Sequence, residues 1–70
     1  MKEFKLREGD EFIALCDLLK ATDLTDTGGE AKHVIAEGQV KVDGATELRK
    51  RCKIRSGQLV EYKGKQVKVI

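Results

Sequence analysis

Five basic side chains fall within seven residues of the second half of the chain: Arg49, Lys50, Arg51, Lys53 and Arg55. If residues 51–55 are extended, alternate side chains lie about 6.6 Å apart, and three cations line one face. Such a row suits contact with successive phosphates of a nucleic-acid backbone, where counterion release supplies most of the sequence-independent affinity. The alternative is that these residues only keep an exposed or edge strand soluble and block its pairing with other chains.

A second candidate for phosphate contact is the pair Gly28 and Gly29, at the expected start of a helix. Two residues without side chains would leave the first helical amides open to a phosphate. Lys32 follows one turn later, and together with Lys41 it is expected to extend the basic strip from a hairpin onto this helix. The alternative is that the glycines serve helix entry or tight packing.

Residues that could support catalysis or bind a metal are few. His33 is the only histidine, so no zinc-ligand spacing and no Ser-His-Asp set can be assembled. Cys16 and Cys52 are expected to be reduced thiols, because nothing marks the chain as secreted. Arg51 and Lys53 flank Cys52 and could lower the pKa of its thiol, but strand alternation should turn that thiol toward the core. We expect no enzyme activity, no metal and no cofactor.

Charge is distributed unevenly along the 70 residues. Residues 1–37 hold five Lys and Arg against nine Asp and Glu, whereas residues 38–70 hold nine against three. A chain with a net charge of only +2 should therefore have an acidic and a basic region, and the basic one suits a polyanion. The charged first twelve residues contain no apolar run typical of a signal peptide or a membrane span, so we expect a cytoplasmic protein.

The first half of the chain predicts one strand and two helices. Residues 3–7 alternate polar and apolar, as in a short half-buried strand. A helix over residues 11–22 would place on one face Phe12, Leu15, Cys16 and Leu19.

The second helix should be short. Thr27 and Glu30 have the spacing of a capping box, with Thr25 as a competing cap, and Gly38 suits the positive φ that ends a helix. Its apolar stripe comprises Ala31, Val34 and Ile35.

After Gly38 the apolar period changes from that of a helix to two, which indicates strands. Asp43 with Gly44, Ser56 with Gly57, and Lys63 with Gly64 are expected to be turns. The fold class is therefore predicted as α+β, with an N-terminal strand, two short helices and then a small, mostly antiparallel β-sheet. Without a linker or a repeat, residues 1–70 are expected to form a single domain.

Several spaced residues resemble the alpha-L RNA-binding motif, usually called the S4 domain. The resemblance covers roughly residues 12–62. The matching positions are Leu15, Leu18, Leu19, Gly28, Gly29, Glu30, Ala31, Lys32, Ile35, Gly38, Val40, Val42, Asp43 and Gly44, and the match extends through Ile54 and Gly57. The chain is most similar to short stand-alone bacterial members. The resemblance implies binding of structured RNA, of the ribosomal or transfer class, without catalysis.

Two departures from the family pattern bear on binding. Many members have a Ser-Arg pair at the start of the second helix, whereas residues 27–30 of this chain read Thr-Gly-Gly-Glu. This difference implies that one phosphate contact of the family is missing here. Many also have Asn-Gly at the hairpin. Asp43 replaces that asparagine, so we expect a negative charge at the hairpin tip that weakens contact with RNA.

The aromatic residues Phe4, Phe12 and Tyr62 all fall at positions expected to be core. Without an exposed ring, recognition of backbone and folded shape is favoured over the reading of unstacked bases.

Two other functions remain open. A winged helix-turn-helix that binds DNA is disfavoured because the outer face of the second helix lacks Arg, Asn and Gln. A protein adaptor would dock its basic strip on an acidic partner in an RNA-containing assembly. The preferred interpretation is an RNA-binding monomer with no small-molecule substrate and no membrane contact.

Overall fold

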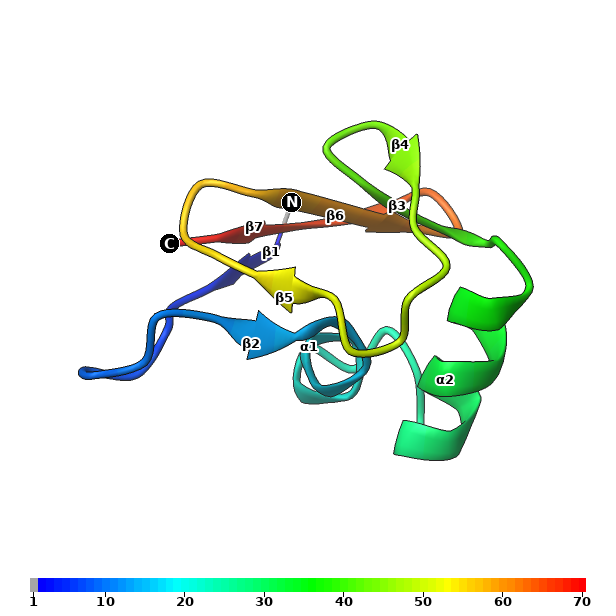
Figure 1. The fold of residues 1–70 in the computed structure, drawn as a ribbon, viewed down its shortest axis with the longest axis horizontal. Coiled ribbons are helices and arrows are strands. Elements are labelled where there is room, and N and C mark those ends of the chain that lie inside the picture. Colours follow the sequence, from blue (N-terminus) through cyan, green and yellow to red (C-terminus); the bar gives the residue numbers. More distant parts are fainter. Residues whose placement is uncertain (1) are drawn as a thin grey trace.

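The computed structural model describes residues 2–70 and contains two sheets and two helices (Figure 1). The larger sheet has the order β1-β7-β6-β3-β4, with bounds β1 (Lys2–Phe4), β7 (Lys65–Val69), β6 (Leu59–Tyr62), β3 (Val40–Val42) and β4 (Ala45–Thr46). The smaller sheet pairs β2 (Ile13–Ala14) with β5 (Lys53–Ile54). The helices are α1 (Leu15–Ala21) and α2 (Gly28–Ala36).

Strand pairing agrees with the predicted class. Only β1 and β7 are parallel, and the other paired strands of the described chain are antiparallel. Both helices and the small β2–β5 sheet lie on the same side of the larger sheet (Figure 1). The prediction of an α+β fold with a mostly antiparallel sheet is confirmed.

Two hairpin turns have the backbone geometry that their sequences predict. Asp43 and Gly44 have φ of 51° and 84°, and Lys63 and Gly64 have φ of 50° and 76°. Two successive positive φ angles are typical of the type I′ turn, whose twist matches that of the strands it joins. These turns set the register of β3 with β4 and of β6 with β7.

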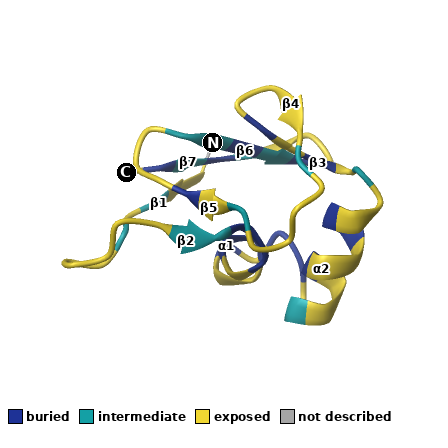
Figure 2. Ribbon diagram, viewed as in Figure 1, coloured by how far each residue is buried: buried dark blue, intermediate teal, exposed yellow. Residues whose placement is uncertain are grey.

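The core lies between the helices and the larger sheet. Figure 2 shows buried segments on the strands, on both helices and in the connection between them, while the hairpin turns are exposed. The largest fully buried side chains come from α1, α2, β3, β5, β6 and β7, and are Leu15, Leu18, Leu19, Ile35, Val40, Ile54, Val60, Val67 and Val69.

The first helix is shorter than predicted. It begins at Leu15 instead of residue 11, because Ile13 and Ala14 pair with β5. Phe12 therefore lies outside the helix and is 39% exposed, so its assignment to the core was wrong. The N-terminal strand is also shorter, ending at Phe4.

The predicted capping box of α2 is present in an altered form. The hydroxyl of Thr27 accepts a hydrogen bond from the Glu30 amide at 3.0 Å, as expected. The Glu30 carboxylate accepts instead from the amide of Asp26, at 2.7 Å, one residue before the usual position. Thr25 does not compete, since its hydroxyl donates to the Thr27 carbonyl. Gly38 ends the helix region with a φ of 76°.

Candidate nucleic-acid interface

The basic segment, defined as residues 49–55, is held against the start of α1 by backbone hydrogen bonds. The amide of Leu15 donates to the Cys52 carbonyl at 2.9 Å, and the amide of Cys16 donates to the Lys50 carbonyl at 3.0 Å. Ala14, the N-cap of α1, offers no side-chain cap. Because the first amides of a helix lack intrahelical partners, the carbonyls of the basic segment take over that role. The segment is thus fixed to the helix end.

The basic segment is less extended than the sequence predicted. Only Lys53 and Ile54 form a strand, in which Lys53 is exposed opposite Ala14 and Ile54 is fully buried. Arg51 lies in the turn before this strand, so the regular ladder over residues 51–55 is absent. The structure nevertheless brings Arg49, Arg51 and Lys53 together around one open hollow, which Cys52 also lines. Three basic residues therefore line one hollow, and a turn, not strand alternation, brings them there.

Phe12 lies beside the basic segment. Lys53 Nζ is 5.0 Å from the centroid of the Phe12 ring, and Arg55 Cζ is 5.7 Å from it. Both distances are within the range of cation–π attraction. The sequence did not reveal this aromatic residue, because Phe12 also has helical spacing with Leu15 and Cys16.

Arg49 is not a free cation. Its guanidinium Nε lies 3.0 Å from Glu47 Oε2, and its Nη2 lies 3.1 Å from Glu47 Oε1. Hydrogen bonds from the side chain and then the amide of Arg49 lower the pKa of Glu47 to about 2. The Glu47 carboxylate is thus ionised at neutral pH and compensates the charge of Arg49. Among the predicted cations, Arg49 has the weakest claim to a phosphate.

Cys52 is a half-buried thiol within this surface. Burial, and then the neighbouring Glu47 carboxylate, raise the pKa of the thiol. A raised pKa disfavours the reactive thiolate. Cys16 is buried in α1, and both cysteines are free. The chemistry of this surface therefore depends on its cations.

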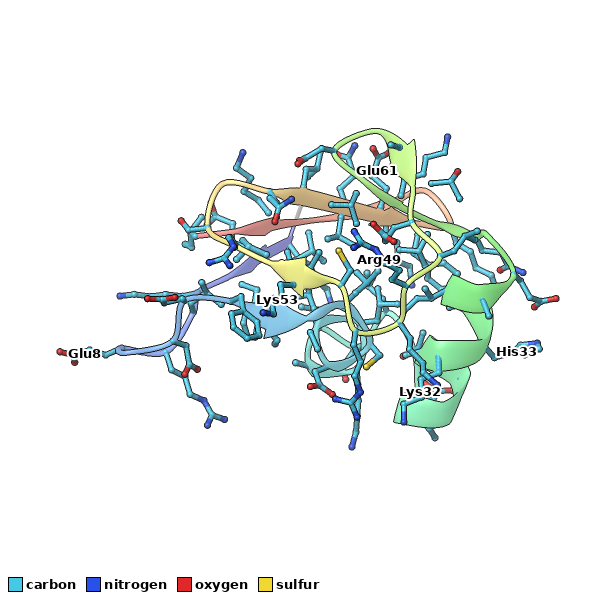
Figure 3. The ribbon with its side chains drawn as sticks, in the orientation of Figure 1. Glu8, Lys32, His33, Arg49, Lys53 and Glu61 are labelled. Atoms are coloured by element: carbon cyan, nitrogen blue, oxygen red, sulfur yellow. The ribbon has the colours of Figure 1, made fainter. Side chains whose placement is uncertain are left out.

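Lys32 and Lys41 lie on different sides of the larger sheet. Lys32 is exposed on α2 (Figure 3). Lys41 alternates with the buried Val40 and Val42, so it points to the outer face of the sheet, opposite Glu61. Figure 3 shows Glu61 on the far side of the sheet from Lys32. The predicted strip that joins Lys41 to Lys32 is wrong, because strand alternation turns Lys41 away from the helices.

Gly28 and Gly29 are not required by packing. A methyl group on Gly28 would have no neighbour within 4 Å, and one on Gly29 would meet only Thr27 Oγ1 at 3.9 Å. Neither glycine has a positive φ. The tight-packing alternative is therefore wrong. The absence of side chains leaves the approach to the start of α2 unobstructed, although Glu30 remains beside it.

Asp43 has a structural role at the β3–β4 turn. Its Oδ1 accepts from the Leu59 amide at 2.9 Å, and its Oδ2 accepts from Gln58 Nε2 at 3.2 Å. These bonds lower the pKa of Asp43. The carboxylate is directed to β6 and does not project freely from the hairpin tip as expected.

Residues 2–70 contain no group of three or more His, Cys, Asp or Glu that could hold a metal ion. None of the helices in this described part of the chain has the length and apolar composition to span a bilayer.

Comparison with known proteins connects this architecture to a family. The S4 domain family matches residues 4–70. YbcJ of Escherichia coli (strain K12) is 57% identical over 58 residues, which is 83% of each protein. A tyrosine–tRNA ligase of Burkholderia lata is 39% identical over 54 residues, which is 77% of this chain but 13% of the ligase.

Solved structures agree with the sequence comparison. The solution structure of E. coli YbcJ, described as an alpha-L motif involved in RNA binding, has a TM-score of 0.77 at 51% identity and covers 100% of this chain and 87% of YbcJ. The 30S ribosomal protein S4e of Thermoplasma acidophilum has a TM-score of 0.68 at 29% identity, over 81% of this chain and 30% of that protein. The resemblance inferred from the spaced glycines and leucines is thus confirmed, and the chain belongs to the S4 domain family.

Proposed function

We propose that this protein binds structured RNA through its basic segment and does not catalyse a reaction. The observation that carries the proposal is the open hollow lined by Arg51 and Lys53, with Arg49 beside them. Because Glu47 compensates Arg49, the principal phosphate contacts are assigned to Arg51, Lys53 and Arg55, all exposed. Neutralising several phosphates at once releases counterions and supplies affinity that does not depend on base sequence.

The anchoring of the basic segment favours recognition of folded RNA. Hydrogen bonds from Leu15 and Cys16 fix the carbonyls of Cys52 and Lys50, and β2 fixes Lys53. Cations on a rigid backbone fit one spacing of phosphates better than others, as the recognition of RNA shape requires. YbcJ, described as involved in RNA binding, has the same fold and supports this assignment.

Lys50, Lys32 and the amides of Gly28 and Gly29 are assigned to the periphery of the interface. Lys50 belongs to the basic segment, and Lys32 is exposed on α2, one turn after the glycines. The start of a helix favours negative charge, and Gly28 and Gly29 add no side chains there, although the Glu30 carboxylate lies beside it. Lys41 is excluded from the interface because it faces the opposite side of the sheet.

The likeness to a 30S ribosomal protein and to part of a tRNA ligase supports ribosomal or transfer RNA as the target class. We attribute no catalytic step to the chain, since the shared segment is only 13% of the ligase. We further propose that residues 1–70 act as one domain, as a monomer, in the cytoplasm where both RNA classes function.

The test is a titration of fluorescent structured RNA and of matched duplex DNA at several salt concentrations. We expect preference for RNA, with the slope of log affinity against log salt reduced by about 2 in Arg51→Ala with Lys53→Ala, since each phosphate contact contributes about 0.9. The matched control is the double variant Lys41→Ala with Lys68→Ala, which removes the same charge from the outer face of the sheet. Each of these lysines lies between two buried residues of its strand, which point to the opposite face.

Equal losses in both double variants would show that only net charge matters and would overturn the assigned surface. Equal binding to RNA and DNA, or no binding to either, would favour the adaptor that docks on an acidic protein.

A further inference from the structure

Phe12 is an exposed aromatic residue that the core does not use. The residue is 39% exposed. Ile13 and Ala14 beside it are half-buried and pack against the core cluster. Tyr62, by contrast, is 4% exposed within the core. Phe12 is therefore not one of the buried core side chains, and part of its surface is open to a ligand.

The surroundings of Phe12 combine cations with open space. Lys53 Nζ and Arg55 Cζ lie 5.0 Å and 5.7 Å from the ring centroid. Phe12 also lines a surface hollow together with Arg51, and a second hollow together with Phe4 and Leu6. An apolar ring beside three cations is unsuited to an apolar protein partner, whose docking would desolvate the charges.

We infer that Phe12 is a stacking site for one unpaired base of the bound RNA, with Lys53 and Arg55 contacting the phosphates next to that base. The inference rests on the proposed RNA binding and adds a ligand class, namely RNA in which an unpaired nucleotide adjoins a paired stem. Aromatic side chains stack on bases of any sequence, and flanking cations follow the backbone.

The hollow shared by Phe12 and Arg51 also contains the acidic residues Asp10, Glu11 and Asp17. Carboxylates repel phosphate but accept hydrogen bonds from the amino groups of bases. The phosphates are therefore placed on the side of Lys53 and Arg55, and the edge of the base on the side of the acidic hollow. Adenine, which stacks well and carries an amino group, is the appropriate probe.

The first experiment uses fluorescence. The chain contains no tryptophan, so Phe12→Trp introduces a single one at the site and retains a ring that can stack. The probes are an RNA hairpin with an overhang of unpaired adenines and the same hairpin with a blunt end. We expect the blunt hairpin to leave the tryptophan emission nearly unchanged and the overhang to quench it. Gln66→Trp, on the outer sheet face, is the control and should not respond to either probe.

The second experiment uses Phe12→Leu, which keeps an apolar side chain and removes the ring. We expect affinity for the overhang hairpin to fall about five- to 100-fold, the range for loss of one stacked base, and affinity for the blunt hairpin to be unchanged. The salt slope should stay that of the wild type, because no charge is removed.

The outcomes separate this inference from the proposed function. One outcome is that RNA binding depends on salt while the emission of Phe12→Trp is not quenched and Phe12→Leu binds as tightly as the wild type. That result would overturn the stacking site and leave the basic interface standing. Failure of the wild type to bind either hairpin would overturn both.

Discussion

Glu47 and Arg49 form a bidentate ion pair at the start of the basic segment. The Glu47 carboxylate accepts hydrogen bonds from Arg49 Nε at 3.0 Å, from Nη2 at 3.1 Å and from the Arg49 amide at 2.9 Å. The Glu47 side chain is 18% exposed and the Arg49 side chain 77% exposed. The Glu47 carboxylate thus fixes the backbone at Arg49, where the basic segment begins. It also compensates one of the five cations of that segment.

Removing this carboxylate should strengthen RNA binding. Glu47→Gln deletes a negative charge and releases the Arg49 guanidinium toward phosphate, so we expect affinity at low salt to rise about two- to fivefold, the worth of one exposed ion pair. The gain should shrink as salt screens the charges. Fluorescence anisotropy measures both effects. Glu61→Gln, on the outer sheet face, is the control; an equal gain there would show a general charge effect.

The same carboxylate should make folding sensitive to acid. The pKa of Glu47 is lowered from 4.5 to about 2, and a lowered pKa contributes stability that is complete above the unfolded-state pKa. As the pH falls from about 5 to 2, this contribution is lost. The urea midpoint of the wild type should therefore fall more steeply over that range than that of Glu47→Gln. Parallel curves would contradict the assigned hydrogen bonds. Asp43, whose pKa is also lowered, adds to the decline in both proteins.

The Thr27 cap should contribute measurably to stability. Thr27→Ala leaves the Glu30 amide without its acceptor and should lower the free energy of unfolding by about 1 kcal/mol. Thr27→Ser keeps the hydroxyl and should cost much less. Urea denaturation followed by circular dichroism distinguishes the two. A cost as large for serine as for alanine would show that the hydroxyl bond is not the cause.

The buried side chain of Ile54 should anchor the basic segment to the core and contribute to the stability of the fold. It is fully buried in β5, opposite Ile13, so Ile54→Ala is expected to lower the free energy of unfolding by about 2–5 kcal/mol. Leu48→Ala removes a similar volume from a residue that is 61% exposed and should change stability by no more than about 0.5 kcal/mol. Equal costs would contradict the burial of β5.

Elements that depend on neighbours in the sequence could be predicted from the sequence. The Thr27 cap, the positive φ of Gly38, and the turns at Asp43 and Lys63 follow from local hydrogen bonds and backbone sterics, which residue types alone specify. Apolar periodicity, a property of each element by itself, indicated the α+β class in the same way.

Features that depend on contacts between distant residues could not be predicted. Helical spacing placed Phe12 in the core, but the pairing of Ile13 with Ile54 delays the helix and leaves the ring exposed beside Lys53. The sequence identified the cations of the basic segment. The pairing of Arg49 with Glu47, two residues earlier, is a local contact. Tertiary structure decided that the basic segment is held against the start of α1 and that Lys41 lies on the sheet face away from the helices. Charge is a property of each residue, whereas the side of the molecule on which that charge lies depends on how remote segments pack.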